Sequence, residues 1–294
     1  MSLIGRFGGA RRVDPSEVAP ELQENTIKDI LDRWDSQPEV KRLGEGHSPS
    51  YSDYLNVSSL VGICTRQHVL AALDDRLHFG TVTGGHRVMW AFGRAVENHI
   101  RSTYLEATAR RGAFGNWSCR CGNHRHQGFF PTTDCETCGG SAHNYSELVL
   151  LDHRRKLKGS PDIVATVGGG WFLPVEIKSM NADEWKGLKR PKGDHIMQVG
   201  VYHRMLAEQG WKVLPQTSII YTSKDFRFGS PYKEFHVDTR DKAVTDMIDT
   251  ALSLAEEVAN HKQAGTLPPR EKCGSPTCTT AKGCPMIVSC WNRD

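Results

Sequence analysis

The sequence predicts an α/β fold in which a mixed central sheet is flanked by helices. The strand-like runs SPDIVATV at 160–167 and WFLPVEIKS at 171–179 are joined by three glycines, and Val175 and Ile177 alternate with charged residues in the second run, which predicts a β-hairpin. Apolar residues recur at helical spacing over 88–109, 194–208 and 239–261. A helix, a hairpin, a second helix, further strands and a last helix, in that order, are typical of a mixed sheet covered by helices.

The other expected elements follow in chain order. A helix is expected at 16–36, ending before Pro38, and a linker rich in Gly, Ser and Pro follows it at 44–53. The run SSLVGICTRQHVLAAL is expected to form the next helix, with Ser58 or Ser59 as its N-cap. Further strands are expected at 145–151, 213–223 and 233–238.

The helix at 88–109 carries an apolar stripe that is expected to face the core for most of its length. The stripe consists of Trp90, Phe92, Val96, Ile100 and Tyr104. Together these elements divide the chain into an N-terminal helix and linker (1–49) and one domain (50–294).

Composition indicates an ordinary globular protein. The chain has 294 residues, a formal net charge of +3, 38% hydrophobic residues and 24% charged residues, which excludes disordered, collagenous and membrane-bundle proteins. There is no apolar run long enough to span a membrane, and the N-terminal MSLIGRFGGARRV lacks the apolar stretch of a signal peptide. We therefore expect a cytoplasmic protein with no membrane partner, whose nine cysteines need an explanation other than disulfides.

Four cysteines lie within twenty residues of one another, in the segment 114–144. Cys119 and Cys121 form one close pair, and Cys135 and Cys138 form another after a polar loop. This spacing predicts a structural zinc knuckle inserted into the domain, because four thiolates complete a tetrahedral shell. His124 and His126 are rival ligands.

The tail at 264–294 contains a second group. It carries Cys273, Cys278, Cys284 and Cys290, and Pro285 directly follows Cys284. A Cys-Pro ending is typical of iron-sulfur ligation, which needs four thiolates. Five thiols are available when Cys64 is included, although Cys64 has an alternative interpretation as an ordinary buried cysteine.

The candidate catalytic residues are Asp162, Glu176 and Lys178. Residues 176 and 178 share one face of a strand, and pairing of the two predicted hairpin strands brings Asp162 beside them. Two close carboxylates repel each other unless a divalent cation lies between them, and such oxygen ligands suit Mg²⁺ or Mn²⁺. A lysine at that place would stabilise a phosphate oxyanion or orient an attacking water.

An Asp, a Glu-x-Lys strand and a following helix with Gln198 and Tyr202 together resemble the PD-(D/E)xK nuclease superfamily, in particular its RecB-like branch. The N- and C-terminal cysteines are similar to those of its iron-sulfur members, which include the CRISPR-associated RecB-like exonucleases, the AddB nuclease domain and phage-encoded relatives. The resemblance covers about residues 55–294 and implies a restriction-endonuclease-like core. It also implies a further metal ligand in a Gly-x-x-x-Glu setting, which places Glu97 in the site, with His99 as second choice.

The resemblance further implies a [4Fe-4S] cluster that ties the tail to the N-terminal helix. Its ligands would be Cys64, Cys284, Cys290 and either Cys273 or Cys278, because Ala281 stands where the family usually has a cysteine. Such a cluster would have a structural role.

Basic runs flank the predicted site and suit contact with phosphates. They are Arg154, Arg155, Lys156 and Lys158 on one side and Lys186, Lys189, Arg190 and Lys192 on the other, with Trp185 placed to stack or to pack. The leading hypothesis is a Mg²⁺- or Mn²⁺-dependent DNA exonuclease acting on single strands or DNA ends in recombination, repair or replication of a phage or bacterial genome. Its protein partners would belong to recombination or CRISPR adaptation. The alternative is a non-catalytic DNA-binding module stabilised by zinc and iron-sulfur sites.

Overall fold

The computed structural model describes residues 39–40, 54–62, 64–73, 81–82, 84–130, 134–140, 144–167, 169–224 and 231–292. The helix expected at 16–36 and the linker at 44–53 lie outside these residues. None of the described helices is both long enough and apolar enough to span a bilayer.

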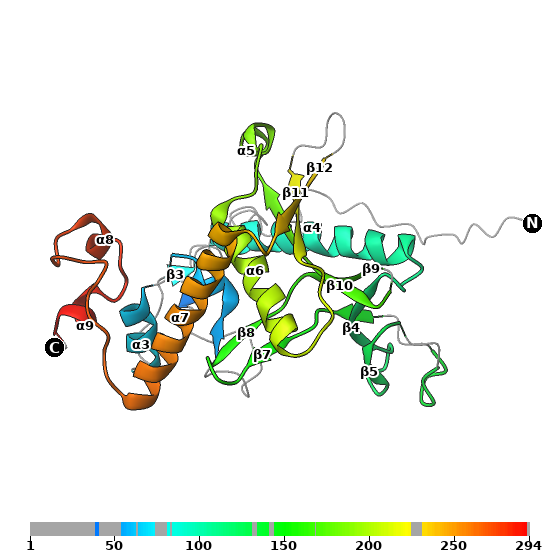
Figure 1. Cartoon of the computed structure of the whole chain (residues 1–294), viewed down its shortest axis with the longest axis horizontal. Coiled ribbons are helices and arrows are strands. Elements are labelled where there is room, and N and C mark those ends of the chain that lie inside the picture. The colour runs from blue at the N-terminus through cyan, green and yellow to red at the C-terminus, as the bar shows by residue number, and fades with distance from the viewer. Residues whose placement is uncertain are drawn as a thin grey trace, which may run out of the picture.

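A mixed sheet forms the centre of the molecule, as predicted (Figure 1). Its strand order is β12-β11-β10-β9-β4-β5, with β6 paired to β4. β10 runs parallel to β11, and the other neighbours are antiparallel. These strands are β4 (Ala113–Ser118), β5 (Arg125–Gly128), β6 (Asn144–Ser146), β9 (Ile163–Val167), β10 (Trp171–Met180), β11 (Gln216–Ser223) and β12 (Tyr232–Asp238).

Helices cover both faces of this sheet. α4 (Gly84–Ala107) packs on one face, where its Ile100 and Leu105 meet Ile163 and Ala165 of β9. Because side chains alternate along a strand, Val164 points the opposite way and packs with α6 (Gly193–Glu208) and α7 (Lys242–Ala264). The α/β class and the helix-covered mixed sheet are therefore confirmed.

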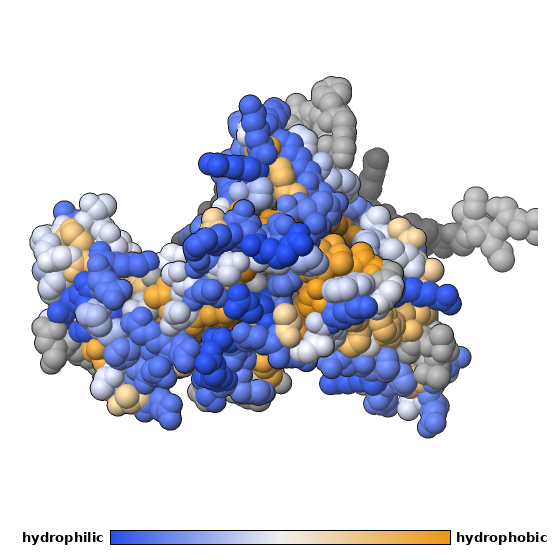
Figure 2. All heavy atoms as spheres, in the orientation of Figure 1, coloured by the Kyte–Doolittle hydropathy of each residue, from blue (hydrophilic) through white to orange (hydrophobic). Residues whose placement is uncertain are grey.

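Smaller elements surround this core. A second sheet has the order β2-β8-β7 and a third pairs β1 with β3, and the tail packs beside α3. Their bounds are β1 (Glu39–Val40), β2 (Leu55–Asn56), the 3₁₀ helix η3 (Val57–Leu60), α3 (Thr65–Leu73), β3 (Thr81–Val82), β7 (Leu150–Asp152), β8 (Leu157–Gly159), α5 (Ala182–Gly187), α8 (Thr279–Lys282) and α9 (Ile287–Asn292). Hydrophilic side chains cover much of the face seen in Figure 2, and an apolar area lies beside β9 and β10.

The predicted hairpin of β9 and β10 is confirmed. Trp171 pairs with Val167 and Val175 pairs with Ile163, and Gly169 and Gly170 turn the chain with φ of 62° and 75°. Only glycine adopts such angles without steric cost, so the glycines explain the tight connection. The helix expected at 194–208 is confirmed as α6, and the one at 239–261 as α7, whose N-cap is Asp241.

Two expectations near the N-terminal side of the domain are wrong in detail. The run around Cys64 is not one helix from Ser58, because Gly62 has φ of 61° and separates η3 from α3, which begins after Cys64. The strand expected at 145–151 is divided, since β6 pairs with β4 whereas β7 pairs with β8.

The apolar stripe of α4 is only partly in the core, which corrects a third expectation. Ile100 is buried, and Val96 and Tyr104 are half-buried in the same cluster. Trp90 and Phe92, however, are 42% and 47% exposed. Helical spacing indicates which residues share a face, but it does not indicate where the sheet beneath that face ends.

Candidate active site and metal centres

Asp162, Glu176 and Lys178 come together at the β9–β10 hairpin. Asp162 immediately precedes β9, and its Oδ2 accepts a 2.6 Å hydrogen bond from the amide of Ile177. Glu176 Oε1 lies 2.5 Å from Lys178 Nζ, which forms an ion pair within β10. Glu176 is 3% exposed and Asp162 is 8% exposed, so both carboxyl groups are buried.

α6 holds Glu176 from the opposite side. Gln198 Nε2 donates to Glu176 Oε1 at 2.8 Å and to the hydroxyl of Tyr202 at 2.9 Å. Gly159 allows Tyr202 to approach, because a Cβ at that glycine would lie 2.4 Å from Tyr202 Cε1. The two residues predicted from the helix motif therefore form one hydrogen-bonded chain that ends at Glu176.

Glu97 reaches the same region from α4. A Cβ placed at Gly93 would lie 3.8 Å from Ser179 Oγ and 4.0 Å from Glu97 Oε1, so α4 crosses the end of β10 closely at this glycine. The Lys178 ammonium and the Glu97 carboxylate attract each other, which favours a lower pKa for Glu97 and a higher pKa for Lys178. His99, the second choice for this role, is exposed.

Glu147 is a site residue that sequence reasoning missed. Its carboxylate raises the pKa values of Glu97, Asp162 and Glu176 as a minor cause in each case, which places it near all three. Arg101 of α4 binds Glu147 through an ion pair. Glu147 belongs to no recognisable motif, and the sequence places it inside the strand expected at 145–151, so no signal in the sequence marks it.

Burial is the largest single influence on the pKa values of Asp162, Glu176 and Lys178. It raises the pKa of Asp162 well above its usual range, and the charge of Glu176 adds to this effect. It also raises the pKa of Glu176, although the Lys178 ammonium opposes the rise. Burial alone would lower the pKa of Lys178, but the carboxylates of Glu176, Asp162 and Glu97 together more than offset this, and the pKa of Lys178 is raised.

One oxygen in the site has no partner. Glu176 Oε2 is buried and accepts no hydrogen bond from any described residue. A buried oxygen without a hydrogen bond destabilises the folded protein, and a cation bound beside it would remove this penalty. Hard carboxylate oxygens from Glu176 and Asp162 are the donors that Mg²⁺ and Mn²⁺ prefer, so the donor set fits such an ion.

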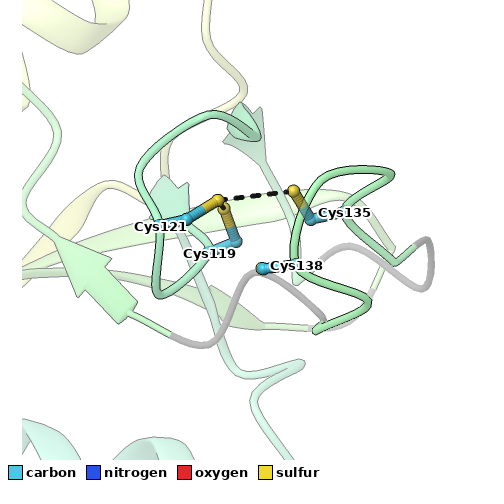
Figure 3. A group of neighbouring side chains, drawn as sticks. All are labelled: Cys119, Cys121, Cys135 and Cys138. Atoms are coloured by element: carbon cyan, nitrogen blue, oxygen red, sulfur yellow. Dashed lines mark hydrogen bonds between the residues drawn. The ribbon is translucent and has the colours of Figure 1, made fainter.

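The four cysteines of the 114–144 segment form a second centre (Figure 3). Cys119 and Cys121 come from the loop after β4, and Cys135 and Cys138 come from a facing loop. Their sulfur atoms all lie within 4.8 Å of one another, the only such set of three or more ligands in the described residues. Tetrahedral Zn–S bonds of about 2.3 Å imply sulfurs roughly 3.8 Å apart. Distances of 3.3 Å for Cys119–Cys121 and 3.7 Å for Cys121–Cys135 are near that value.

The chain also favours thiolate at one of these cysteines. Burial would raise the pKa of Cys119, but the amide of His124 donates to its Sγ at 3.2 Å, and the net pKa is lowered to about 6. The thiolate is the metal-binding form, so the loop is suited to a metal ion such as zinc. The rival ligands His124 and His126 do not belong to the group of ligand atoms that lie within 4.8 Å of one another.

The tail cysteines gather around the start of α3. Burial raises the pKa of Cys273, and Cys278, Cys64 and Cys284 add to the rise. Burial likewise raises the pKa of Cys284, with contributions from Cys64 and Cys290. The five thiols from both ends of the domain are therefore electrostatic neighbours, although no three of them lie as close together as the four in the knuckle.

Arginines fasten the tail in this place. Arg66 of α3 is buried, and its guanidinium donates to the carbonyls of Pro268 and Cys290 at 2.7 and 3.2 Å. Arg270 donates to the same Cys290 carbonyl at 2.7 Å. These bonds hold α9 against α3 independently of any metal.

The basic runs separate into buried and exposed members. Arg155 is buried between Asp152 and Glu208, and Lys158 is also buried, so neither is placed for phosphate contact, whereas Arg154 and Lys156 are exposed. Of the second run, Lys189, Arg190 and Lys192 line a groove of about 750 Å³ that leads to the start of α6. Trp185 is half-buried under the ammonium of Lys233, 4.4 Å from its ring centre, which indicates a packing role.

Comparisons with known proteins give remote structural similarity only. No protein-family model matches the chain, and no curated protein matches its sequence. Several solved structures match, among them the following three. SSO0001 has a TM-score of 0.38 and 15% identity, over 89% of this chain and 91% of that one. An alkaline exonuclease, LHK-Exo from Laribacter hongkongensis, has a TM-score of 0.37 and 17% identity, over 72% and 93% of the two chains.

The same exonuclease in complex with dAMP has a TM-score of 0.36 and 16% identity, over 74% and 95% of the two chains. Scores this low carry no conclusion about the activity of this chain. Functional inference therefore rests on its own side chains.

Proposed function

We propose that the chain is a divalent-metal-dependent nuclease that hydrolyses phosphodiester bonds in DNA. The observation that carries the proposal is the buried Glu176, which has one oxygen paired to Lys178 and Gln198 and the other without a described partner. Glu176 and Asp162 would hold the ion, and Glu97 and Glu147 add negative charge that acts on both carboxyl groups. Bound there, Mg²⁺ or Mn²⁺ would supply charge neutralisation and a more acidic water.

The protein side chains have separate tasks in this proposal. The Lys178 ammonium is fixed beside Glu176, where it can donate to a non-bridging phosphate oxygen or to the attacking water. Gln198 is a positioning residue, because it orients Glu176 and is itself held by Tyr202. Lys189, Arg190 and Lys192 line the groove at the start of α6, the helix that carries Gln198, and suit contact with the phosphate backbone.

The test is hydrolysis of end-labelled single-stranded and duplex DNA, blocked at either end, with and without Mg²⁺ or Mn²⁺. We expect metal-dependent shortening from an unblocked end of single strands or of frayed duplex ends. Asp162→Asn, Glu176→Gln and Lys178→Ala should each lower kcat by at least about 100-fold while the protein remains folded. Unchanged rates in all three variants would refute the assignment, and tight DNA binding without hydrolysis would favour the non-catalytic module.

We further propose that the knuckle holds Zn²⁺ and that the tail holds a [4Fe-4S] cluster. Each thiolate of such a cluster binds a different iron, so its ligands stand further apart than those of a single zinc ion. This agrees with the wider grouping of Cys64, Cys273, Cys278, Cys284 and Cys290. Anaerobically prepared protein should contain about four iron and four sulfide per chain.

The fourth cluster ligand can be decided by two matched variants. Cys273 interacts electrostatically with Cys278, Cys64 and Cys284, and the amide of Ala281 donates to the Sγ of Cys278 at 3.4 Å and lowers the pKa of that thiol. We expect only the true ligand to bleach the cluster and lower the Tm when it is replaced by serine. Bleaching in Cys273→Ser alone assigns Cys273, and bleaching in Cys278→Ser alone assigns Cys278. A colourless, iron-free wild-type protein that is stable would exclude the cluster.

A further inference from the structure

The N-terminal half of α4 carries apolar side chains past the end of the sheet. Val88, Met89, Trp90 and Phe92 are 61%, 55%, 42% and 47% exposed, whereas Ile100 and Leu105 of the same helix are buried. At 100° per residue these four side chains point to different sides of the helix, so the one nearest the candidate active site has to be identified from helix geometry. Directly after them, at Gly93, α4 passes close to Ser179 and to the carboxylate of Glu97.

Trp90 lies on the active-site side of the helix. It precedes Glu97 by seven residues, or two turns, so the two side chains share one face and are separated by about 10 Å along the axis. Phe92 is two residues further on, about 200° around the helix, and the ammonium of Lys224 lies 5.9 Å from its ring centre. The two exposed rings therefore face different surroundings, and only that of Trp90 is on the side of Glu97.

Two side chains of α4 flank Trp90 along the helix. The imidazole of His86 lies 6.1 Å from its ring, one turn before it. Arg94 follows one turn after it and is close enough to Glu97 to act on it electrostatically. An aromatic face beside a cationic side chain is the combination by which proteins hold single-stranded nucleic acid, because bases stack on the ring while the cation meets a phosphate.

We propose that Trp90 stacks on an unpaired base of the strand that enters the active site, about three nucleotides from the scissile phosphate. The position follows from the separation of about 10 Å between Trp90 and Glu97 and a spacing of about 3.4 Å per nucleotide in a stacked strand. The proposal rests on the proposed nuclease function and adds the origin of its strand preference. Bases inside a duplex already stack on each other, so this contact selects an unpaired strand.

Binding is measured first, on the full chain carrying Glu176→Gln so that the probe is not cleaved. The probe is a fluorescent oligodeoxythymidylate, read by anisotropy. Loss of one stacked base predicts that Trp90→Ala weakens binding by about 5- to 150-fold. Trp90→Phe keeps an aromatic face and should restore most of the affinity, which separates stacking from misfolding.

Two controls carry exposed aromatic rings elsewhere. Phe92→Ala removes a ring of similar exposure from another side of the same helix. Trp171→Ala removes a tryptophan that is 36% exposed and lies 4.6 Å below the Lys212 ammonium, at the far end of β10. Both should bind within about 2-fold of the parent protein if only the Trp90 ring holds a base.

An abasic probe then tests the register. A single abasic residue three nucleotides from the cleaved phosphate should weaken the parent protein and leave Trp90→Ala unchanged. If Trp90→Ala binds the intact probe as tightly as the parent, or if the abasic residue weakens both equally, the stacking proposal is refuted. Failure of the nuclease proposal would look different, because the wild-type chain would bind the probe with this same Trp90 dependence and not cleave it.

Discussion

Replacement of Lys178 by methionine tests the electrostatic arrangement of the site most directly. The substitution removes the ammonium that lies 2.5 Å from Glu176 and leaves a carboxylate whose side chain is 4% exposed. Removing one partner of a buried ion pair costs about 3–5 kcal/mol. The Lys178 side chain is 25% exposed, so water screens part of this interaction, and we expect a loss of about 2–3 kcal/mol near pH 8.

The loss should depend on pH in a defined direction. The pKa of Glu176 is raised by burial in the folded state, so its ionisation opposes folding as the pH rises above the ordinary carboxyl range. Lys178 limits that rise, and its removal raises the pKa of Glu176 further. The stability difference between wild type and Lys178→Met should therefore be largest at pH 8 and shrink as the pH falls and Glu176 becomes protonated.

The assay is urea unfolding at several pH values without added Mg²⁺ or Mn²⁺. Lys192→Met is the matched control, because its ion pair with Glu184 spans 3.0 Å but has side chains that are 41% and 50% exposed. That pair should contribute at most about 0.5 kcal/mol, with little pH dependence. Lys178→Arg keeps the charge and should recover most of the stability, but not the turnover, because a guanidinium is larger and planar. Equal, pH-independent losses in Lys178→Met and Lys192→Met would refute the reasoning.

Three further outcomes are expected. Cys135→Ser/Cys138→Ser should lose about one zinc per chain by elemental analysis, and undiminished zinc would place the metal elsewhere. Cys64→Ser should bleach the tail cluster and lower the Tm by an amount that corresponds to several kcal/mol, because the cluster closes a loop across most of the domain. A variant with full colour would show that Cys64 is not a ligand. Gly159→Ala places a Cβ 2.4 Å from Tyr202 Cε1, so it should lower the free energy of unfolding by about 1–3 kcal/mol. It should also reduce kcat, because a displaced Tyr202 no longer holds Gln198, and a wild-type Tm would contradict this packing.

Much of the central architecture could be predicted because it depends on local patterns. Alternation along β10, with glycines before it, predicts both the hairpin and the shared side of Glu176 and Lys178. The structure places Asp162 beside them through the bond to the Ile177 amide. Gln198 and Tyr202 occur four residues apart on a helix, and this spacing is sufficient to put both on the face that meets Glu176.

Other features depend on tertiary context, which a local pattern does not contain. β4 and β5 were not expected, because AFGNWS and RHQG contain almost no aliphatic residues, and pairing with β9 and closure of the cysteine loops stabilise them instead. Glu147 reaches the site only because β6 and β7 belong to different sheets and the chain bends between them. Exposure of Trp90 likewise depends on the length of the sheet below α4.

The continuity of β4 has a mechanical consequence, because this one strand belongs to the central sheet and also leads directly into the knuckle. Its first residues, Ala113 and Phe114, pair with Ala165 and Val164 of β9, and its last residues pair with β5 and β6 up to Ser118, which directly precedes Cys119. A continuous strand resists bending, so the cysteine loops are expected to move together with the sheet and not independently of it. A force on the knuckle therefore becomes a torque on β9, the strand that directly follows Asp162.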